Sequence, residues 1–260
     1  MAKKAPWWKF ALKILALLVW TAASTIVSQL VIGRLMIMIM GVDIFSQPVP
    51  TAIYSALSYI LTLFMVVFVP PIVISIRNSR KGKKKVVFDK KAAREELGLK
   101  DLLTWTDLGL APVGFIVYIL IASGLSALFA IFPWFNANEA QDVGFSLYAT
   151  GVDRVIAFIV LVVIAPIAEE IIFRGWLYGK LRNTIFDRYS NIVSVITSTL
   201  LVSLVFGIVH LQWNVGVNVF AMSIVLCALR EITGTIYSGI LLHMIKNGVA
   251  FYLLYVLGMH

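Results

Sequence analysis

Long apolar stretches constrain this chain more than any other feature of its sequence. Apolar residues make up 60% of the 260 residues, and charged residues only 13%. About 20 apolar residues in a helix cross a bilayer core of roughly 30 Å, and several stretches reach that length without an internal charge. The strands of a membrane barrel would alternate polar and apolar residues, which these stretches do not. We therefore predict an all-α fold, a polytopic transmembrane helical bundle.

The apolar stretches predict about seven membrane spans, with six and eight as the alternatives. Prolines 70 and 71 should kink or end the second span unless neighbours satisfy the freed carbonyls. No sequence repeat and no inverted pair of halves of the transporter kind is apparent. The predicted spans are residues 10–32, 52–76, 108–132, a fourth from 152 past Pro166, then 192–211, 215–229 and 236–257.

Basic residues gather between the spans. The net charge is +9, and ten of the 22 Lys and Arg residues fall between Arg77 and Lys100. By the positive-inside rule, residues 77–101 form a cytoplasmic loop, and Lys3, Lys4 and Lys9 indicate a cytoplasmic N-terminus. We expect an integral protein of the cell (plasma) membrane whose basic loop lies on anionic lipid headgroups, a partner-binding role being the alternative.

The position of the basic residues between the spans argues against nucleic acid as a partner. The sequence leaves the oligomeric state open.

Two adjacent carboxylates, Glu169 and Glu170, lie inside an apolar stretch. A charge at mid-bilayer costs roughly 2.5 to 3.5 kcal/mol, so such a pair needs a partner or a purpose. Glu170 and Arg174 are four residues apart and share a helix face, so Arg174 can neutralise Glu170. Glu169 points about 100° away and stays free to accept a proton from water. The alternative is that both glutamates lie at a cytoplasmic interface, where the cost disappears.

Three more polar side chains occur in the later spans. His210 ends the apolar run STLLVSLVFGIVH, one turn after Phe206. His243 lies about midway along the last span, with Asn247 one turn further on the same face. Structural roles are open to each of them, as an interfacial histidine or as hydrogen bonds between helices. Because all of these groups fall within the last 92 residues together with Glu169, we favour one shared chemical site.

These side chains suit the hydrolysis of an amide. A carboxylate in an apolar cavity can act as the general base that takes a proton from water. Imidazole and carboxamide groups can donate hydrogen bonds to the oxyanion of a tetrahedral intermediate. Alternatively, Glu169, His210 and His243 could hold a divalent metal such as zinc, with a water in the open position. The expected cofactor is therefore a divalent metal or none.

Three motifs in order resemble those of a known family. EEIIFR at 169–174, FGIVH at 206–210 and HMIKN at 243–247 fit the patterns EExxxR, FxxxH and HxxxN. In this order they resemble the CAAX prenyl protease and bacteriocin-processing family of intramembrane peptidases, over roughly residues 150–255. The resemblance implies an endopeptidase acting on a membrane-associated or lipidated peptide. It implies Glu169 as the water-activating carboxylate, Glu170 and Arg174 as its supports, and three ligands or oxyanion donors: His210, His243 and Asn247.

The resemblance suggests a division of the chain. We expect an N-terminal two-span region over residues 1–105 and a catalytic membrane domain over residues 106–260. Two rival functions remain. One is a proton- or metal-coupled transporter that uses the same polar groups as a relay. The other is a catalytically inert immunity or scaffold protein of the same fold.

The predicted depths of the site residues disagree. Counted from the basic residue Lys180, Glu169 lies about 11 residues, or roughly 16 Å, into the membrane. His210 is about 22 residues from Arg188, or roughly 33 Å in one straight helix. A single site requires this gap to close. We expect that residues 189–195 lie partly along the surface or that the helices tilt strongly.

Overall fold

The computed structural model describes residues 6–41, 47–82, 89–100, 102–139 and 151–258. All the regular structure in these residues is helical, as the sequence predicts. Seven helices are long and apolar enough to cross a membrane, which agrees with the predicted number. The predictions that rest on Lys3, Lys4 and residues 83–88 of the basic loop lie outside the described residues.

The first two spans are longer than predicted. α1 (Trp7–Met40) is 34 residues long and continues past Arg34. The second span comprises α2 (Pro48–Leu63), the π-helical segment η1 (Phe64–Phe68) and α3 (Val69–Arg80). Pro70 and Pro71 lie in the first turn of α3, directly after η1, so their missing N–H groups leave carbonyls of that π segment without helical donors. The helix nevertheless runs on through both prolines to Arg80.

The fourth span carries the carboxylate pair and combines two types of helix. It is one continuous run from Gly151 to Phe186, in which α-helical and π-helical turns alternate. Extra residues in π turns re-aim the side chains that follow them, and such turns are frequent at functional sites. The parts in order are α6 (Gly151–Phe158), η2 (Ile159–Ile164), α7 (Ala165–Glu170), η3 (Ile171–Tyr178) and α8 (Gly179–Phe186).

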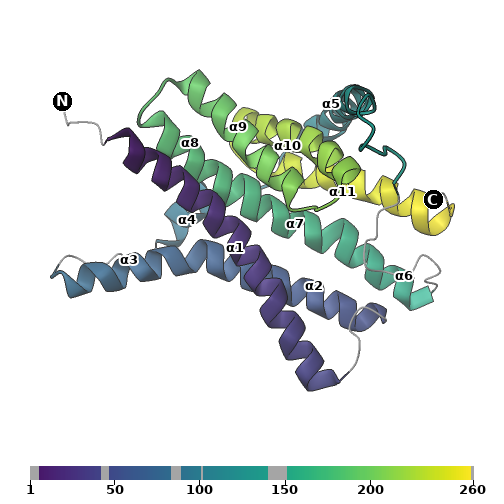
Figure 1. Cartoon of the computed structure of the whole chain (residues 1–260), viewed down its shortest axis with the longest axis horizontal. Helices are drawn as coiled ribbons and strands as arrows, with labels where there is room; N and C mark the ends of the chain where they lie inside the picture. Colours follow the sequence, from purple (N-terminus) through teal and green to yellow (C-terminus); the bar gives the residue numbers. More distant parts are fainter. Residues whose placement is uncertain (1–5, 42–46, 83–88, 101, 140–150, 259–260) are drawn as a thin grey trace.

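The remaining four spans are single helices, the last of which is extended by a π segment. A capping box between Thr104 and Asp107 starts the third span. Figure 1 shows α9 and α10 lying along the long fourth helix, with α5 at the far side of α10 and α11. These helices are α5 (Trp105–Phe129), α9 (Asn191–Ile208), α10 (Trp213–Thr233) and α11 (Tyr237–Phe251), which continues as η4 (Tyr252–Val256).

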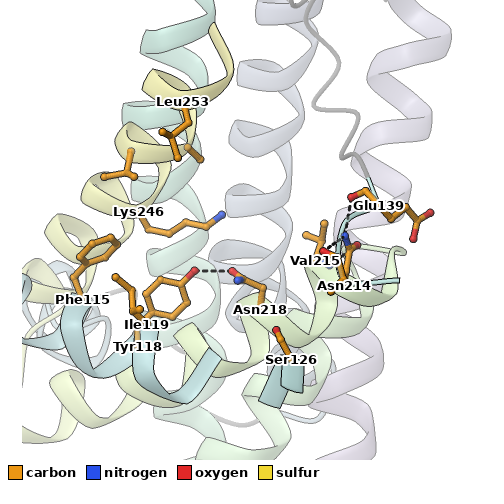
Figure 2. A pocket seen from close by; sticks show the side chains of 13 residues that line it. Phe115, Tyr118, Ile119, Ser126, Glu139, Asn214, Val215, Asn218, Lys246 and Leu253 are labelled. Carbon is orange, nitrogen blue, oxygen red and sulfur yellow. Dashed lines mark hydrogen bonds between the residues drawn. The ribbon is translucent and has the colours of Figure 1, made fainter. Parts of the chain in front are cut away.

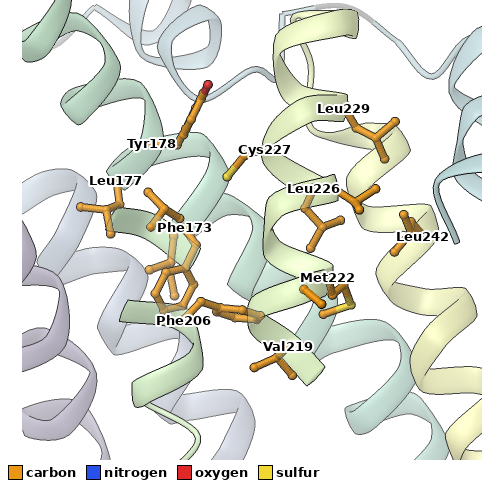
Figure 3. Close-up of a cluster of buried hydrophobic side chains, with 14 of the residues drawn as sticks. Phe173, Leu177, Tyr178, Phe206, Val219, Met222, Leu226, Cys227, Leu229 and Leu242 are labelled. Atoms are coloured by element: carbon orange, nitrogen blue, oxygen red, sulfur yellow. The ribbon is translucent and has the colours of Figure 1, made fainter. Parts of the chain in front are cut away.

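The core lies between η3, α9, α10 and α11 (Figure 3). The α9–α10 pair is held close by two glycines. A Cβ at Gly207 would lie 2.9 Å from the Gly216 oxygen, and one at Gly216 would lie 3.0 Å from the Gly207 oxygen. Small residues allow such backbone contact between membrane helices. Large side chains fill the remaining space, among them Leu177, Phe206, Met222 and Leu226.

Part of the predicted basic loop packs against protein. The loop contains α4 (Lys90–Glu96), whose Glu96 forms an ion pair with Lys180 of α8. The backbone at the end of α4 lies against two glycines of the fourth span, Gly175 and Gly179. A Cβ at Gly175 would meet the Leu97 oxygen at 2.9 Å, and one at Gly179 would meet the Glu96 oxygen at 3.3 Å. Gly98 accepts a hydrogen bond of 3.2 Å from the Ile236 amide. The glycine pair therefore serves as the contact site for this segment.

Candidate active site

Glu169 and Glu170 both lie on α7, the single α-helical stretch between η2 and η3. Pro166 opens this stretch. The two carboxylates point to different neighbours, as the sequence predicts from their angular separation. Glu170 is fully buried in a polar network, and Glu169 reaches a cavity.

Glu170 forms the buried network. Arg174 Nη1 donates to Glu170 Oε1 at 3.0 Å, which confirms the predicted pairing four residues apart. His243 Nδ1, from the last span, lies 3.1 Å from the same Glu170 oxygen. The Arg174 guanidinium in turn lies 4.3 Å from the centre of the Phe206 ring. Space for the carboxylate depends on Gly239, where a Cβ would lie 3.1 Å from Glu170 Oε2.

Glu169 faces the cavity and has contacts with two other helices. Tyr59 Oη of α2 donates a 2.6 Å hydrogen bond to Glu169 Oε1. His243 Nε2 lies 3.8 Å from Glu169 Oε2. The Glu169 side chain keeps 16% of its surface exposed, whereas that of Glu170 has none. Water can therefore reach Glu169 and not Glu170.

Tyr59 is not among the residues selected from the sequence. This residue belongs to the N-terminal region, 110 positions from its partner. A signal was present in the second span, because polar residues repeat there along one side of the helix at Thr51, Ser55, Ser58 and Thr62. A tyrosine beside such a stripe indicates a helix that faces protein. The identity of its partner could not be read from the pattern.

His243 connects the two carboxylates. Its Nδ1 faces Glu170 and its Nε2 faces Glu169. An ionised carboxylate only accepts, so the contact with the Arg174-paired Glu170 assigns the hydrogen to Nδ1. In the neutral ring, Nε2 then presents a lone pair to the cavity.

His210 lies in the turn between α9 and α10, outside both spanning helices. Its Nδ1 is 2.7 Å from the Phe206 carbonyl, which can only accept, so Nδ1 carries the hydrogen here too. Burial lowers the pKa of the His210 imidazole below its usual value, which favours the neutral ring. The next residue, Leu211, has a φ of 57°, a strained conformation for a branched side chain. This sharp turn places the ring over the cavity.

Asn247 lies one turn after His243 on α11. Its Nδ2 donates a 2.8 Å hydrogen bond to the Leu161 carbonyl of η2. Pro166, five residues after Leu161, has no N–H to donate to this carbonyl, so Asn247 supplies the donor and secures the helix that carries the carboxylates. One hydrogen of its carboxamide remains available to the cavity.

A cavity of about 230 Å³ joins these groups. Its walls come from α2, the fourth span, the α9–α10 turn, α10 and α11. Its polar lining residues are Tyr59, Glu169, His210, His243, Lys246, Asn247 and Tyr255. The structure thus brings together four of the six residues selected from the sequence at one cavity, with Glu170 and Arg174 buried behind them.

The depth conflict is resolved by the ends of the helices. The fourth span does not end near Lys180 but continues to Phe186, 17 residues beyond Glu169, or about 26 Å. α9 begins at Asn191, 19 residues before His210, or about 29 Å. The two residues therefore lie at similar depths. The error came from taking the first basic residue as the end of the helix.

The predicted metal ligands do not form a complete set. Within the described residues, no group of three or more His, Cys, Asp or Glu side chains is arranged to hold a metal ion. Glu169 and His243 Nε2 face each other at 3.8 Å, and the contact of His243 Nδ1 with Glu170 leaves Nε2 free as a ligand. A third ligand does not join these two in the described part of the chain.

The comparisons with known proteins concern the second half of the chain. Residues 151–249 match the Rce1-like family model, described as type II CAAX prenyl endopeptidase Rce1-like. No curated protein and no solved structure matches the chain. Tyr59 lies outside the matched segment, which contains Glu169, Glu170, Arg174, His210, His243 and Asn247.

Proposed function

We propose that this chain is an intramembrane endopeptidase, because residues 151–249 match the family model described as type II CAAX prenyl endopeptidase Rce1-like. Its substrate is a membrane-associated or lipidated peptide, and the protein lies in the cell membrane with its N-terminus in the cytoplasm. The observation that carries the proposal is the position of Glu169. Its carboxylate is oriented by Tyr59, faces His243 and lines a cavity large enough for a peptide segment and water.

Glu169 is the base in the proposed reaction. A water between the carboxylate and the peptide carbonyl loses a proton to Glu169 as its oxygen attacks the carbonyl carbon. The unprotonated Nε2 of His210 accepts a hydrogen bond from the second hydrogen of this water and so orients the water. His243 Nε2 lies 3.8 Å from Glu169, too far for a direct hydrogen bond, and receives the proton from the carboxyl group through a bridging water. The resulting imidazolium passes the proton to the leaving amine as the C–N bond breaks.

The oxyanion needs donors while the tetrahedral intermediate exists. Asn247 donates to the oxyanion the carboxamide hydrogen that is not bonded to the Leu161 carbonyl. His243 donates from Nε2 once it has taken up the proton, because both of its nitrogens then carry hydrogen. Glu170 and Arg174 take no part in bond making. They fix the orientation of the His243 ring from behind.

Substitution of Glu169 tests the proposal. The full-length chain in lipid vesicles is supplied with a library of membrane-bound peptides, and cleavage is measured by mass spectrometry. We expect the Glu169→Gln variant to lose a factor of about 10² to 10⁴ in kcat, the usual contribution of a general base. Glu95→Gln, which changes an exposed glutamate on α4, is the control.

Three outcomes would contradict the proposal. Equal cleavage by the wild type and Glu169→Gln would remove Glu169 from the reaction. No cleavage by the wild type, together with Glu169-dependent proton flux across the vesicles, would support the transporter instead. An inert protein would show neither activity.

Metal removal separates the remaining alternatives. Since the described residues lack a three-ligand group, we expect cleavage to survive dialysis against a strong chelator, with less than a twofold change in kcat. A loss of activity that zinc restores would instead support Glu169, His210 and His243 as metal ligands. A soluble zinc peptidase treated in parallel confirms that the chelator works.

A further inference from the structure

Lys246 is a cation placed between two cavities. It lies on α11 between His243 and Asn247 and lines the cavity that contains Glu169. It also lines a second cavity of about 430 Å³, and the two share Val215, Lys246 and Ala250 as wall residues. The second cavity therefore adjoins the candidate active site, with an ammonium group where they meet.

This ammonium group forms no direct ion pair in the described part of the chain. No ion pair or hydrogen bond joins the Lys246 side chain to another described residue. The nearest candidate, Glu169, is engaged by Tyr59 and His243. An unpaired charge in a spanning helix is costly and marks a functional position more often than a structural one.

The second cavity offers another donor beside this cation. Tyr118 Oη donates to Asn218 Oδ1 at 2.7 Å, so the oxygen of Asn218 is occupied and its NH₂ group remains. Figure 2 shows the Lys246 ammonium extending toward the Tyr118–Asn218 pair. The carboxylate of Glu139 lies at the opposite end of the cavity in this view. The end near Lys246 therefore presents donors and positive charge.

We propose that the second cavity is a substrate subsite in which Lys246 and Asn218 bind a carboxylate of the peptide. An ammonium and a carboxamide NH₂ suit the two oxygens of one carboxylate. Apolar walls from Phe115, Ile119 and Leu253 accommodate the adjoining side chains. The carboxylate belongs to the end of the peptide chain or to an acidic side chain. This inference rests on the proposed endopeptidase function. It gives a binding site to a part of the substrate that the reacting groups do not contact.

Peptides that differ only in this carboxylate test the proposal. Three peptides share one cleavable sequence: one ends in a free carboxylate, one in an amide, and one in an amide with a glutamate near its end. For the full-length wild type, we expect kcat/KM to be about tenfold to a hundredfold higher for a carboxylate peptide than for the plain amide. This is the range expected for one charge-assisted hydrogen bond. Comparison of the first and third peptides identifies the source of the carboxylate.

Variants of Lys246 and Asn218 complete the test. Lys246→Met removes the charge and keeps the length, so the carboxylate-to-amide ratio should fall to about one, mainly through KM. Lys246→Arg keeps the charge and should keep the ratio, whereas Asn218→Ala should lower it in part. Thermal unfolding of each variant confirms that the fold is intact.

Three results would overturn the proposal. The first is a wild-type ratio near one for both carboxylate peptides while cleavage continues, which leaves the endopeptidase function standing. The second is an equal loss of activity on all three peptides in Lys246→Met, which would assign Lys246 to the reaction itself. The third is Lys246-dependent competition by phosphatidylglycerol, which would identify a lipid phosphate as the ligand.

A binding measurement separates failure of the subsite from failure of the function. The Glu169→Gln variant should bind the carboxylate peptide without cleaving it, and at least tenfold more tightly than the amide peptide. If the wild type shows no cleavage, and the binding preference nevertheless persists and requires Lys246, the endopeptidase function fails and the carboxylate site stands. If the preference is absent, the site fails as well.

Discussion

Gly239 gives the Glu170 carboxylate the space that it occupies. A Cβ at this position would lie 3.1 Å from Glu170 Oε2 and 3.4 Å from a methyl group of Leu226. Both neighbours are fully buried, so neither can move away easily. Gly239→Ala should therefore push the carboxylate from Arg174 and His243 and destabilise the protein by about 1–3 kcal/mol, as measured by thermal unfolding in detergent.

A second glycine provides the matched control for this prediction. Gly124 lies inside α5, and a Cβ there would meet nothing within 4 Å. Gly124→Ala should leave stability unchanged or raise it by up to about 1 kcal/mol, since alanine restricts the unfolded chain. Equal stability of the two variants would show that Glu170 tolerates displacement.

Local spacing determined which site contacts could be predicted. The Glu170–Arg174 ion pair follows from a separation of four residues on one helix, and the structure confirms it. The contact of Glu170 with His243 spans 73 positions and that of Glu169 with Tyr59 spans 110. Such pairs are set by how helices pack, which one sequence does not specify.

At the scale of elements, α2 completes a site whose other parts lie in the second half of the chain. Tyr59→Phe removes only the hydroxyl that donates to Glu169. We expect kcat to fall about tenfold, with KM and thermal stability unchanged, because one hydrogen bond to a charged group is lost. Steady-state kinetics on a cleaved peptide measure the effect.

Tyr54 provides the control on the same helix. It lies five residues earlier and is not one of the residues that line the cavity. Tyr54→Phe should leave kcat within a factor of two. If both variants lose activity and stability together, Tyr59 has a structural role only.

The ends and internal turns of the helices were the least predictable elements. The seven spans follow from apolar length, and the structure reproduces their number. The π segments on either side of Glu169 do not follow from the sequence, because their carbonyls are satisfied by distant groups such as the Asn247 carboxamide. The helix end assumed at Lys180 was wrong for a related reason, since the helix continues to Phe186 and a basic residue near a helix end does not mark its last turn.

At the scale of the whole molecule, the orientation in the membrane is a prediction from charge alone. The end that carries α4 and the last turn of α10 is rich in Lys and Arg, and should face the cytoplasm. Glu95 of α4 and Asn138 after α5 are both exposed, and Cys227, the chain's single cysteine, is buried. In intact cells, Asn138→Cys should react with a membrane-impermeant maleimide, whereas Glu95→Cys should react only after lysis. The reverse pattern would invert the orientation.

The helices that border the site differ greatly in length. The fourth span has 36 residues, or roughly 54 Å, whereas its neighbour α9 has 18, or roughly 27 Å. One hydrocarbon layer of about 30 Å matches the short helix but not the whole long one, so the long helix tilts or its charged ends, with Asp153 and Lys180, project beyond the layer. This mismatch couples the geometry around Glu169 and His210 to the acyl chains that surround it. Lipid chain length therefore becomes an experimental variable in its own right, and membranes of different thickness will not be equivalent surroundings for this protein.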